Sequence, residues 1–139
     1  MDLPTALAFA HEVHRGVVTT LRRDGRPQLS NVLFAADAEG RPVVSVTDDR
    51  AKTANLRRDP RVALHVTDAS FWRYVVLDGT ATLSAVAQTP DDATVDGLVD
   101  YYRQLNGEHP DWDDYRRAMV ADRRLLLTVH ATSAYGQLG

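Results

Sequence analysis

A short basic segment, RAKTANLRRDPRVALHV at residues 50–66, carries the side chains best suited to bind an anion. Arg50 and Lys52 stand at the start of a predicted helix that ends near Pro60. A helix start already has free backbone N–H groups and the positive end of the helix dipole, so added cations are unfavourable there unless an anion binds. Arg50, Lys52 and Asn55 are spaced two and three residues apart and can converge over this helix start. They predict a phosphate-binding site.

The charge distribution of the whole chain supports a local anionic partner. The 139 residues carry a net charge of −3 at pH 7 with histidine neutral. Residues 50–61 hold five cations and one acid, a local charge of +4, so the remaining chain carries −7. One concentrated basic segment in an acidic protein favours a small anionic ligand and argues against general nucleic-acid binding. A solvated basic helix face is the alternative that composition leaves open.

A second group of polar side chains lies on the strand expected at PQLSNVL. Alternation along a strand places Gln28 and Ser30 on one face and Asn31 on the other. These groups and the strand's backbone amides can hydrogen-bond the edge of a flat heterocycle, although a solvent-facing strand side fits the pattern equally well. Trp72 and Tyr74 are two residues apart on a predicted strand and should project the same way. Stacking on a ligand, packing at a subunit interface and packing in the core all remain open for them.

Several other chemistries lack their motifs. No glycine-rich fingerprint follows a strand, and no Gly-x-Ser-x-Gly elbow is present. Cysteine is absent, which excludes disulfides, thiolate metal sites and cysteine nucleophiles. The histidines of HEVH, His11 and His14, are three residues apart where the zinc protease motif needs four, so no metal site is expected. His65 and His130 lie in apolar strands and are expected at the core or its rim.

The pattern of elements predicts one domain over residues 1–139, mainly β with peripheral helices and therefore α+β. β-Branched runs are joined by turn signals such as Asp24-Gly25, which predicts a hairpin. Short strands with such turns favour an antiparallel barrel. Asp78-Gly79 is expected to form a bulge or turn in a long strand. Helices are expected at residues 3–14 and 51–58, from a Thr89 cap to Asn106, and at 111–121.

An ordered set of motifs resembles a known family. DGRPQLSNV, the basic segment preceded by Ser45, GTATL and the late insert GEHPDWDDYRRAMVADRRLLLT together resemble the flavin and deazaflavin split-barrel oxidoreductases, relatives of pyridoxamine 5′-phosphate oxidase. The insert is most similar to the branch that binds the deazaflavin coenzyme F420. The resemblance implies an antiparallel split β-barrel of the FMN-binding type and a homodimer with cofactor sites at the subunit interface.

The resemblance also implies where the cofactor lies. Its phosphate would lie on Arg50, Lys52 and Asn55, with Thr53 and Ser45 nearby. Its ring system would run along the strand that contains Gln28, Ser30 and Asn31. Trp72 and Tyr74 would line the site. One departure is that HATSAYGQLG, at the C-terminus, lacks the Arg-x-His pair of the vitamin B6 oxidases, so that reaction is not expected.

The expected function is therefore that of an oxidoreductase that uses coenzyme F420 to transfer a hydride to a small electron-poor acceptor. FMN is the alternative cofactor, and a non-catalytic F420-binding or storage protein is the alternative function. No catalytic residue can be named, because the cofactor carries the reactivity. Arg57, Arg58 and Arg61 could meet the carboxylates of the F420 tail. The sequence has no signal peptide and no apolar run of membrane-spanning length, which predicts a cytoplasmic protein.

Overall fold

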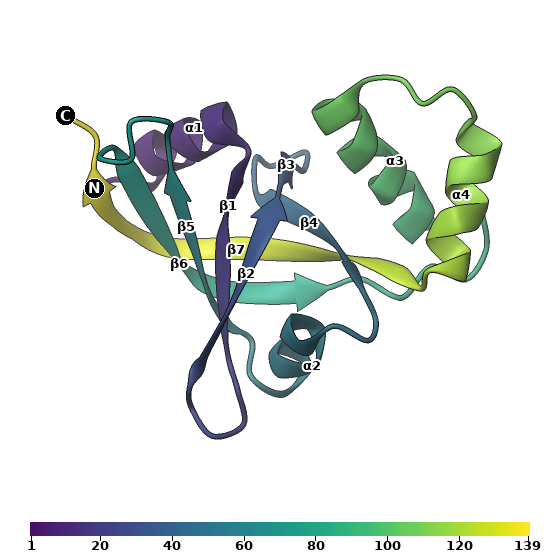
Figure 1. Ribbon diagram of the computed structural model, residues 1–139, viewed down its shortest axis with the longest axis horizontal. Helices are drawn as coiled ribbons and strands as arrows, with labels where there is room; N and C mark the ends of the chain where they lie inside the picture. The colour runs from purple at the N-terminus through teal and green to yellow at the C-terminus, as the bar shows by residue number, and fades with distance from the viewer.

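The computed structural model describes residues 1–139 and shows a curled seven-stranded antiparallel sheet with four helices (Figure 1). The strand order is β2-β1-β5-β6-β7-β4-β3. The two ends of the sheet do not pair with each other, so the barrel is split. The predicted architecture, mainly β with peripheral helices around an antiparallel split barrel, is confirmed. The strands are β1 Arg15–Leu21, β2 Pro27–Leu33, β3 Ala35–Ala36, β4 Pro42–Thr47, β5 Arg61–Thr67, β6 Tyr74–Leu83 and β7 Arg124–Gln137.

The main core lies on the inner face of the sheet. Alternate residues of β5 and β6, such as Leu64 and Leu77, are fully buried, while their strand neighbours are more exposed. Helix α1, Leu3–Val13, contributes Phe9 to this core, and helix α2, Ala51–Arg58, contributes Leu56. Burying the inner face in this way orients the outer face of the same strands away from the core.

Two further helices, α3 Ala93–Asn106 and α4 Trp112–Ala121, lie side by side at one end of the sheet (Figure 1). They have a small apolar cluster of their own, centred on Leu98 and Tyr115. The prediction of a Thr89 cap for α3 is wrong. Asp92 caps the helix instead, because its Oδ1 accepts a hydrogen bond from the Val95 N–H, while Oδ2 accepts from two preceding backbone N–H groups.

Two predicted local features of the strands, a hairpin and a bulge, are present. The β1–β2 hairpin turns around Gly25, whose positive φ of 87° suits glycine. The bulge predicted at Asp78-Gly79 is also present, as a register shift in the β6–β7 ladder. None of the helices has the length and apolar character that a membrane span requires.

Candidate functional site

A groove of about 330 Å³ lies where the sheet is split, between β2 and β4. Ser30 and Asn31 of β2 form part of one wall, and Ser45 of β4 forms part of the other. Tyr101 of α3 also lines the groove, and its hydroxyl donates a 2.9 Å hydrogen bond to the Leu33 carbonyl of β2. The remaining polar lining consists of Thr47 and three cationic side chains, Arg50, Lys52 and Arg124.

The groove is a concentrated positive site with no acid in its lining. Arg50, Lys52 and Arg124 contribute three cations, and none of them has a carboxylate partner within salt-bridge distance. Eight other arginines are paired with aspartate or glutamate: Arg41, Arg57, Arg61, Arg73, Arg103, Arg116, Arg117 and Arg123. Unneutralised cations that face one another across a cavity are suited to bind an anion.

Arg124 is the groove residue that sequence reasoning missed. One of its terminal nitrogens donates a 3.3 Å hydrogen bond to the Ser45 hydroxyl, while its buried Nε has no partner. Buried donors are normally satisfied, so this Nε is available to donate to an acceptor that enters the groove. No local motif points to Arg124, because it reaches the groove through the pairing of β7 with β4, in which it lies opposite Thr47.

The start of α2 adds backbone donors to these cations. Arg50 is the N-cap residue and makes no capping hydrogen bond through its side chain. The Thr53 hydroxyl donates a 2.8 Å hydrogen bond to the Thr47 carbonyl and so ties this first turn to the end of β4. The first N–H groups of the helix therefore remain available for an anion, as the sequence predicted.

The pKa of Lys52 responds to this environment. Burial lowers it below the ordinary value of 10.5, and the positive charges of Arg50 and Arg124 lower it further. A bound phosphate would reverse the effect of the neighbouring charges, because it favours the protonated amine.

The lowered pKa predicts a pH dependence of anion binding. Lys52 holds its charge below its pKa in the free protein and loses it as the pH rises through that value. Affinity for a phosphate-bearing ligand should therefore decline at a pH below 10.5, earlier than an ordinary lysine would allow. Titrations between about pH 7 and pH 10 should show the decline in the wild-type protein, and the variant Lys52→Arg should largely lack it. Parallel curves for the two proteins would contradict a role for the Lys52 charge.

The structure brings five of the ten predicted cofactor-binding residues together in the groove: Arg50, Lys52, Ser45, Ser30 and Asn31. Thr53 lies just behind it, fully buried and bonded to β4. Asn55 faces the interior, where its Nδ2 donates a 3.1 Å hydrogen bond to the Thr20 hydroxyl of β1. Helical periodicity turns Asn55 away from the start of α2, so in this chain it positions the helix on the sheet.

The other three predicted site residues also lie outside the groove lining. Gln28 is near the far end of β2, where it accepts a hydrogen bond from Arg22. Tyr74 begins β6 and packs against His65, with ring centroids 5.6 Å apart. The prediction that Trp72 shares a strand with Tyr74 is wrong. Trp72 lies in the β5–β6 turn and is 75% exposed.

The three arginines considered for the coenzyme tail have protein partners. Arg57 pairs with Asp48 at 2.6 Å, and Arg61 pairs with Asp59 at 2.8 Å. Arg58 donates hydrogen bonds to the Leu21 carbonyl and to the Asn55 amide oxygen. These contacts do not support the idea that the three side chains await the carboxylates of a cofactor.

The fold is an antiparallel split barrel with a cationic groove. Comparison with known families identifies the family to which the chain belongs. Residues 3–136 match the family described as pyridoxamine 5′-phosphate oxidase. Because the match covers nearly the whole chain, the protein belongs to this family.

Solved structures share the fold. A conserved hypothetical protein from Mycobacterium tuberculosis is 20% identical, with a TM-score of 0.75 over 96% of this chain and 82% of the other. A protein named F420 reductase is 25% identical, with a TM-score of 0.70 over 94% of this chain and 95% of the other. The heme storage protein HutZ from Vibrio cholerae is 15% identical, with a TM-score of 0.69 over 96% of this chain and 93% of the other. The fold alone therefore accommodates more than one function.

Proposed function

We propose that this protein is an oxidoreductase that uses coenzyme F420, bound in the groove between β2 and β4, to reduce a small electron-poor organic acceptor. The observation that carries the proposal is the set of three unpaired cations, Arg50, Lys52 and Arg124, around a cavity with no acid. The likeness over nearly full length to an F420 reductase favours the deazaflavin over FMN.

The residues present fit the phosphate of such a cofactor. Lys52 and Arg124 supply charge-assisted donors, and the unpartnered Nε of Arg124 would gain an acceptor. The first turn of α2 supplies backbone N–H groups next to them. On the β2 side, Ser30 and Asn31 offer polar groups along the edge of a planar ring, because β2 is a terminal strand of the sheet.

In the proposed mechanism, the bound deazaflavin supplies the hydride, and the chain positions the cofactor and shields it from water. Arg50, Lys52 and Arg124, at the cationic end of the groove, would hold the phosphate of the cofactor. Val32, Leu33 and Val44 provide apolar walls that exclude water from the ring. Binding the cofactor and the acceptor side by side would make the hydride transfer effectively unimolecular. Orientation of this kind can supply a large part of an enzyme's rate acceleration.

We further propose that a second copy of the chain covers the exposed apolar surface. Five large apolar or aromatic side chains within the folded region are more than half exposed: Leu29, Leu33, Phe71, Trp72 and Tyr135. Phe71 has a positive φ of 74°, an uncommon conformation that holds the Phe71 and Trp72 rings at the tip of a turn. Exposed apolar surface of this kind is typical of protein interfaces. In a dimer, Trp72 could reach the groove of the partner subunit.

A single surface change should test the dimer. Leu29 lies on β2 and is 60% exposed, so Leu29→Asp should leave the monomer fold intact but place a charge in the interface. Sedimentation velocity should show a dimer for the wild-type protein and for the apolar control Leu29→Met, and a monomer for Leu29→Asp. A monomeric wild-type protein at micromolar concentration would contradict the proposed assembly.

Turnover separates an enzyme from a storage protein. Reduced coenzyme F420 should be oxidised when the protein is mixed with a conjugated enone or a quinone, and the rate should exceed that of a protein-free control. Tight binding of the coenzyme without oxidation by any acceptor would favour the storage function instead.

A further inference from the structure

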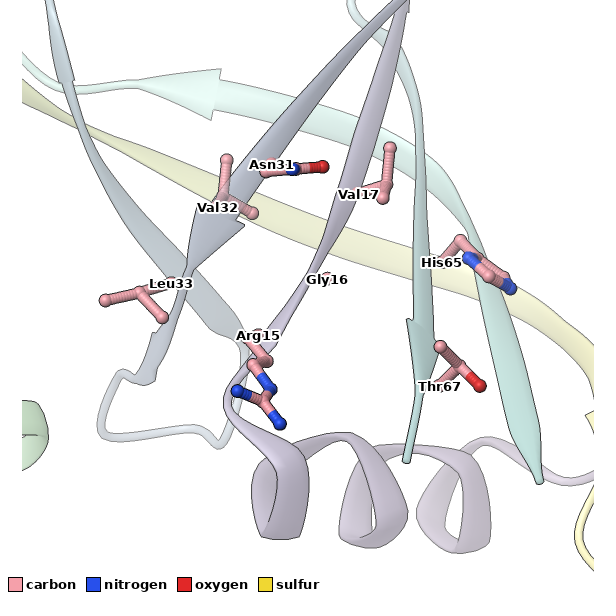
Figure 2. A pocket seen from close by; sticks show the side chains of 8 residues that line it. All are labelled: Arg15, Gly16, Val17, Asn31, Val32, Leu33, His65 and Thr67. Carbon is pink, nitrogen blue, oxygen red and sulfur yellow. The ribbon is translucent and has the colours of Figure 1, made fainter. Parts of the chain in front are cut away.

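A second cavity, of about 400 Å³, opens beside the groove on the other side of β2. Its lining comes from three neighbouring strands, β2, β1 and β5, and Figure 2 shows Arg15 of β1 between Leu33 of β2 and Thr67 of β5. A cavity of this size lies near the lower end of the usual range for small-molecule sites. We refer to it as the β1–β5 wedge.

The wedge lies where the pairing of β1 with β5 ends. Three residue pairs join the strands, from Val17↔His65 to Thr19↔Ala63, and the strands have no further pairing toward α1. At the edge of this pairing, Gly16 approaches so closely that an added Cβ would lie 2.4 Å from the His65 carbonyl oxygen. Glycine thus permits the close approach and adds no side chain to the wedge.

The polar groups of the wedge are suited to an oxygen-rich anion. Arg15 and His65 contribute a guanidinium and an imidazole, and neither side chain makes a hydrogen bond or ion pair within the chain. Asn31 adds an amide, and the lining contains no carboxylate. Thr67 is less available, because its hydroxyl already bonds to the Phe71 and Arg73 carbonyls. Apolar Val17, Val32 and Leu33 complete the walls.

The wedge adjoins the cofactor groove. Asn31, Val32 and Leu33 line both cavities, so the wedge and the groove adjoin along this short stretch of β2. The His65 ring also packs against the Tyr74 ring, which restrains its orientation. A molecule in the wedge would therefore lie beside the proposed position of the ring, with Arg15 and His65 as its polar partners.

We propose that the β1–β5 wedge is the acceptor subsite and that it selects a planar conjugated acceptor bearing a carboxylate, which Arg15 binds. This assignment rests on the proposed F420-dependent function. The acceptor's β-carbon gains a hydride from the reduced coenzyme, and its C=C bond becomes a single bond. The α-carbon then takes a proton from water, and the coenzyme, once it has lost its hydride, releases a proton to water. The acceptor thus gains two electrons and two hydrogens, and the coenzyme loses them. Arg15 and His65 stabilise the negative charge that passes through the conjugated oxygen.

The test compares two probes and two arginine variants. trans-Cinnamate carries a carboxylate, and cinnamamide is its neutral counterpart of nearly the same shape. Calorimetry on the F420-loaded protein, with the coenzyme oxidised so that no reaction occurs, should show tighter binding of cinnamate. Arg15→Gln should weaken cinnamate about tenfold and leave cinnamamide nearly unchanged, because a charge-assisted bond is lost. The control Arg23→Gln, at an exposed turn position, should change neither.

Coenzyme affinity, measured in the same samples, distinguishes failure of the acceptor subsite from failure of the coenzyme site. Arg15→Gln should bind F420 as tightly as the wild-type protein does, because Arg15 does not line the groove. Equal binding of cinnamate to wild-type and Arg15→Gln proteins, or no binding to either, would overturn the proposed acceptor subsite. Neither result would contradict the proposed coenzyme site. Failure of the wild-type protein to bind F420 would overturn both.

Discussion

Replacing Lys52 and Arg124 together by glutamine should weaken coenzyme binding by about a hundredfold or more. Each side chain offers a charge-assisted hydrogen bond to the cofactor phosphate, and bonds of this kind contribute about 1.5–3 kcal/mol each. A loss of about 2.8 kcal/mol corresponds to a factor of one hundred in affinity. Fluorescence titration of the apo-protein with F420 should measure the change, and the single changes should each cost about tenfold.

The same double variant should be no less stable than the wild-type protein when no coenzyme is bound. The lowered pKa of Lys52 shows that the folded state disfavours its charge, through burial and the nearby charges of Arg50 and Arg124. That cost is fully present below the lowered pKa and is lost as the pH rises from there to 10.5, so removing the charge at pH 7 relieves it. Thermal unfolding should therefore show an equal or higher Tm without coenzyme and a smaller rise in Tm with coenzyme.

A matched control separates local contacts from the overall change in charge. Arg23→Gln/Arg26→Gln removes the same two charges from the exposed β1–β2 turn, outside the groove. Its coenzyme affinity should remain within about twofold of wild type, because exposed distant charges are screened by salt. If both double variants lost affinity equally, the groove would not be the binding site.

Gly79→Val should destabilise the fold by about 3 kcal/mol or more, the upper range for forcing extra volume into a packed interior. An added Cβ at Gly79 would lie 2.0 Å from the His130 carbonyl oxygen and 2.9 Å from the Ala131 Cα. These are backbone atoms of β7, so no side-chain rotation can relieve the contact. The affected position is the bulge in the central β6–β7 ladder. Urea unfolding followed by circular dichroism should show the loss.

Gly97→Ala provides the contrast for that prediction. Its added Cβ would meet the end of the Leu126 side chain at 2.4 Å, and that side chain can move. Alanine also gains up to about 1 kcal/mol of helix propensity over glycine within α3. The variant should therefore unfold close to the wild-type midpoint. A Gly79→Val protein as stable as Gly97→Ala would show that β6 and β7 do not approach as closely as described.

Local sequence signals were sufficient for much of the fold. The bounds of α2, the Asp24-Gly25 hairpin and the Asp78-Gly79 bulge follow from turn residues, helix breakers and β-branched runs, which act over a few residues. The start of α3 was misplaced because Thr89 and Asp92 both resemble caps. Only the hydrogen bond from the Val95 N–H shows which of them ends the non-helical segment.

The candidate site was predictable where it is local and not where it depends on strand pairing. Arg50 and Lys52 could be found because they flank one helix start. Arg124 could not, because the β4–β7 register brings it to the groove from a distant part of the chain. Both its spacing from Lys52 and its motif position predict Asn55 in the phosphate site, whereas the packing of α2 on β1 directs its side chain toward Thr20. Tertiary contacts therefore decide where the Arg124 and Asn55 side chains lie.

The binding of F420 and FMN to apo-protein, measured side by side with wild-type and Lys52→Gln/Arg124→Gln proteins, tests the central claim most directly. We expect wild-type protein to bind F420 more tightly than FMN, and the double variant to lose most of its affinity for both. Wild-type protein that binds neither compound, or a double variant that binds F420 as tightly as wild type, would contradict the proposal that a redox coenzyme anchors its phosphate in this groove.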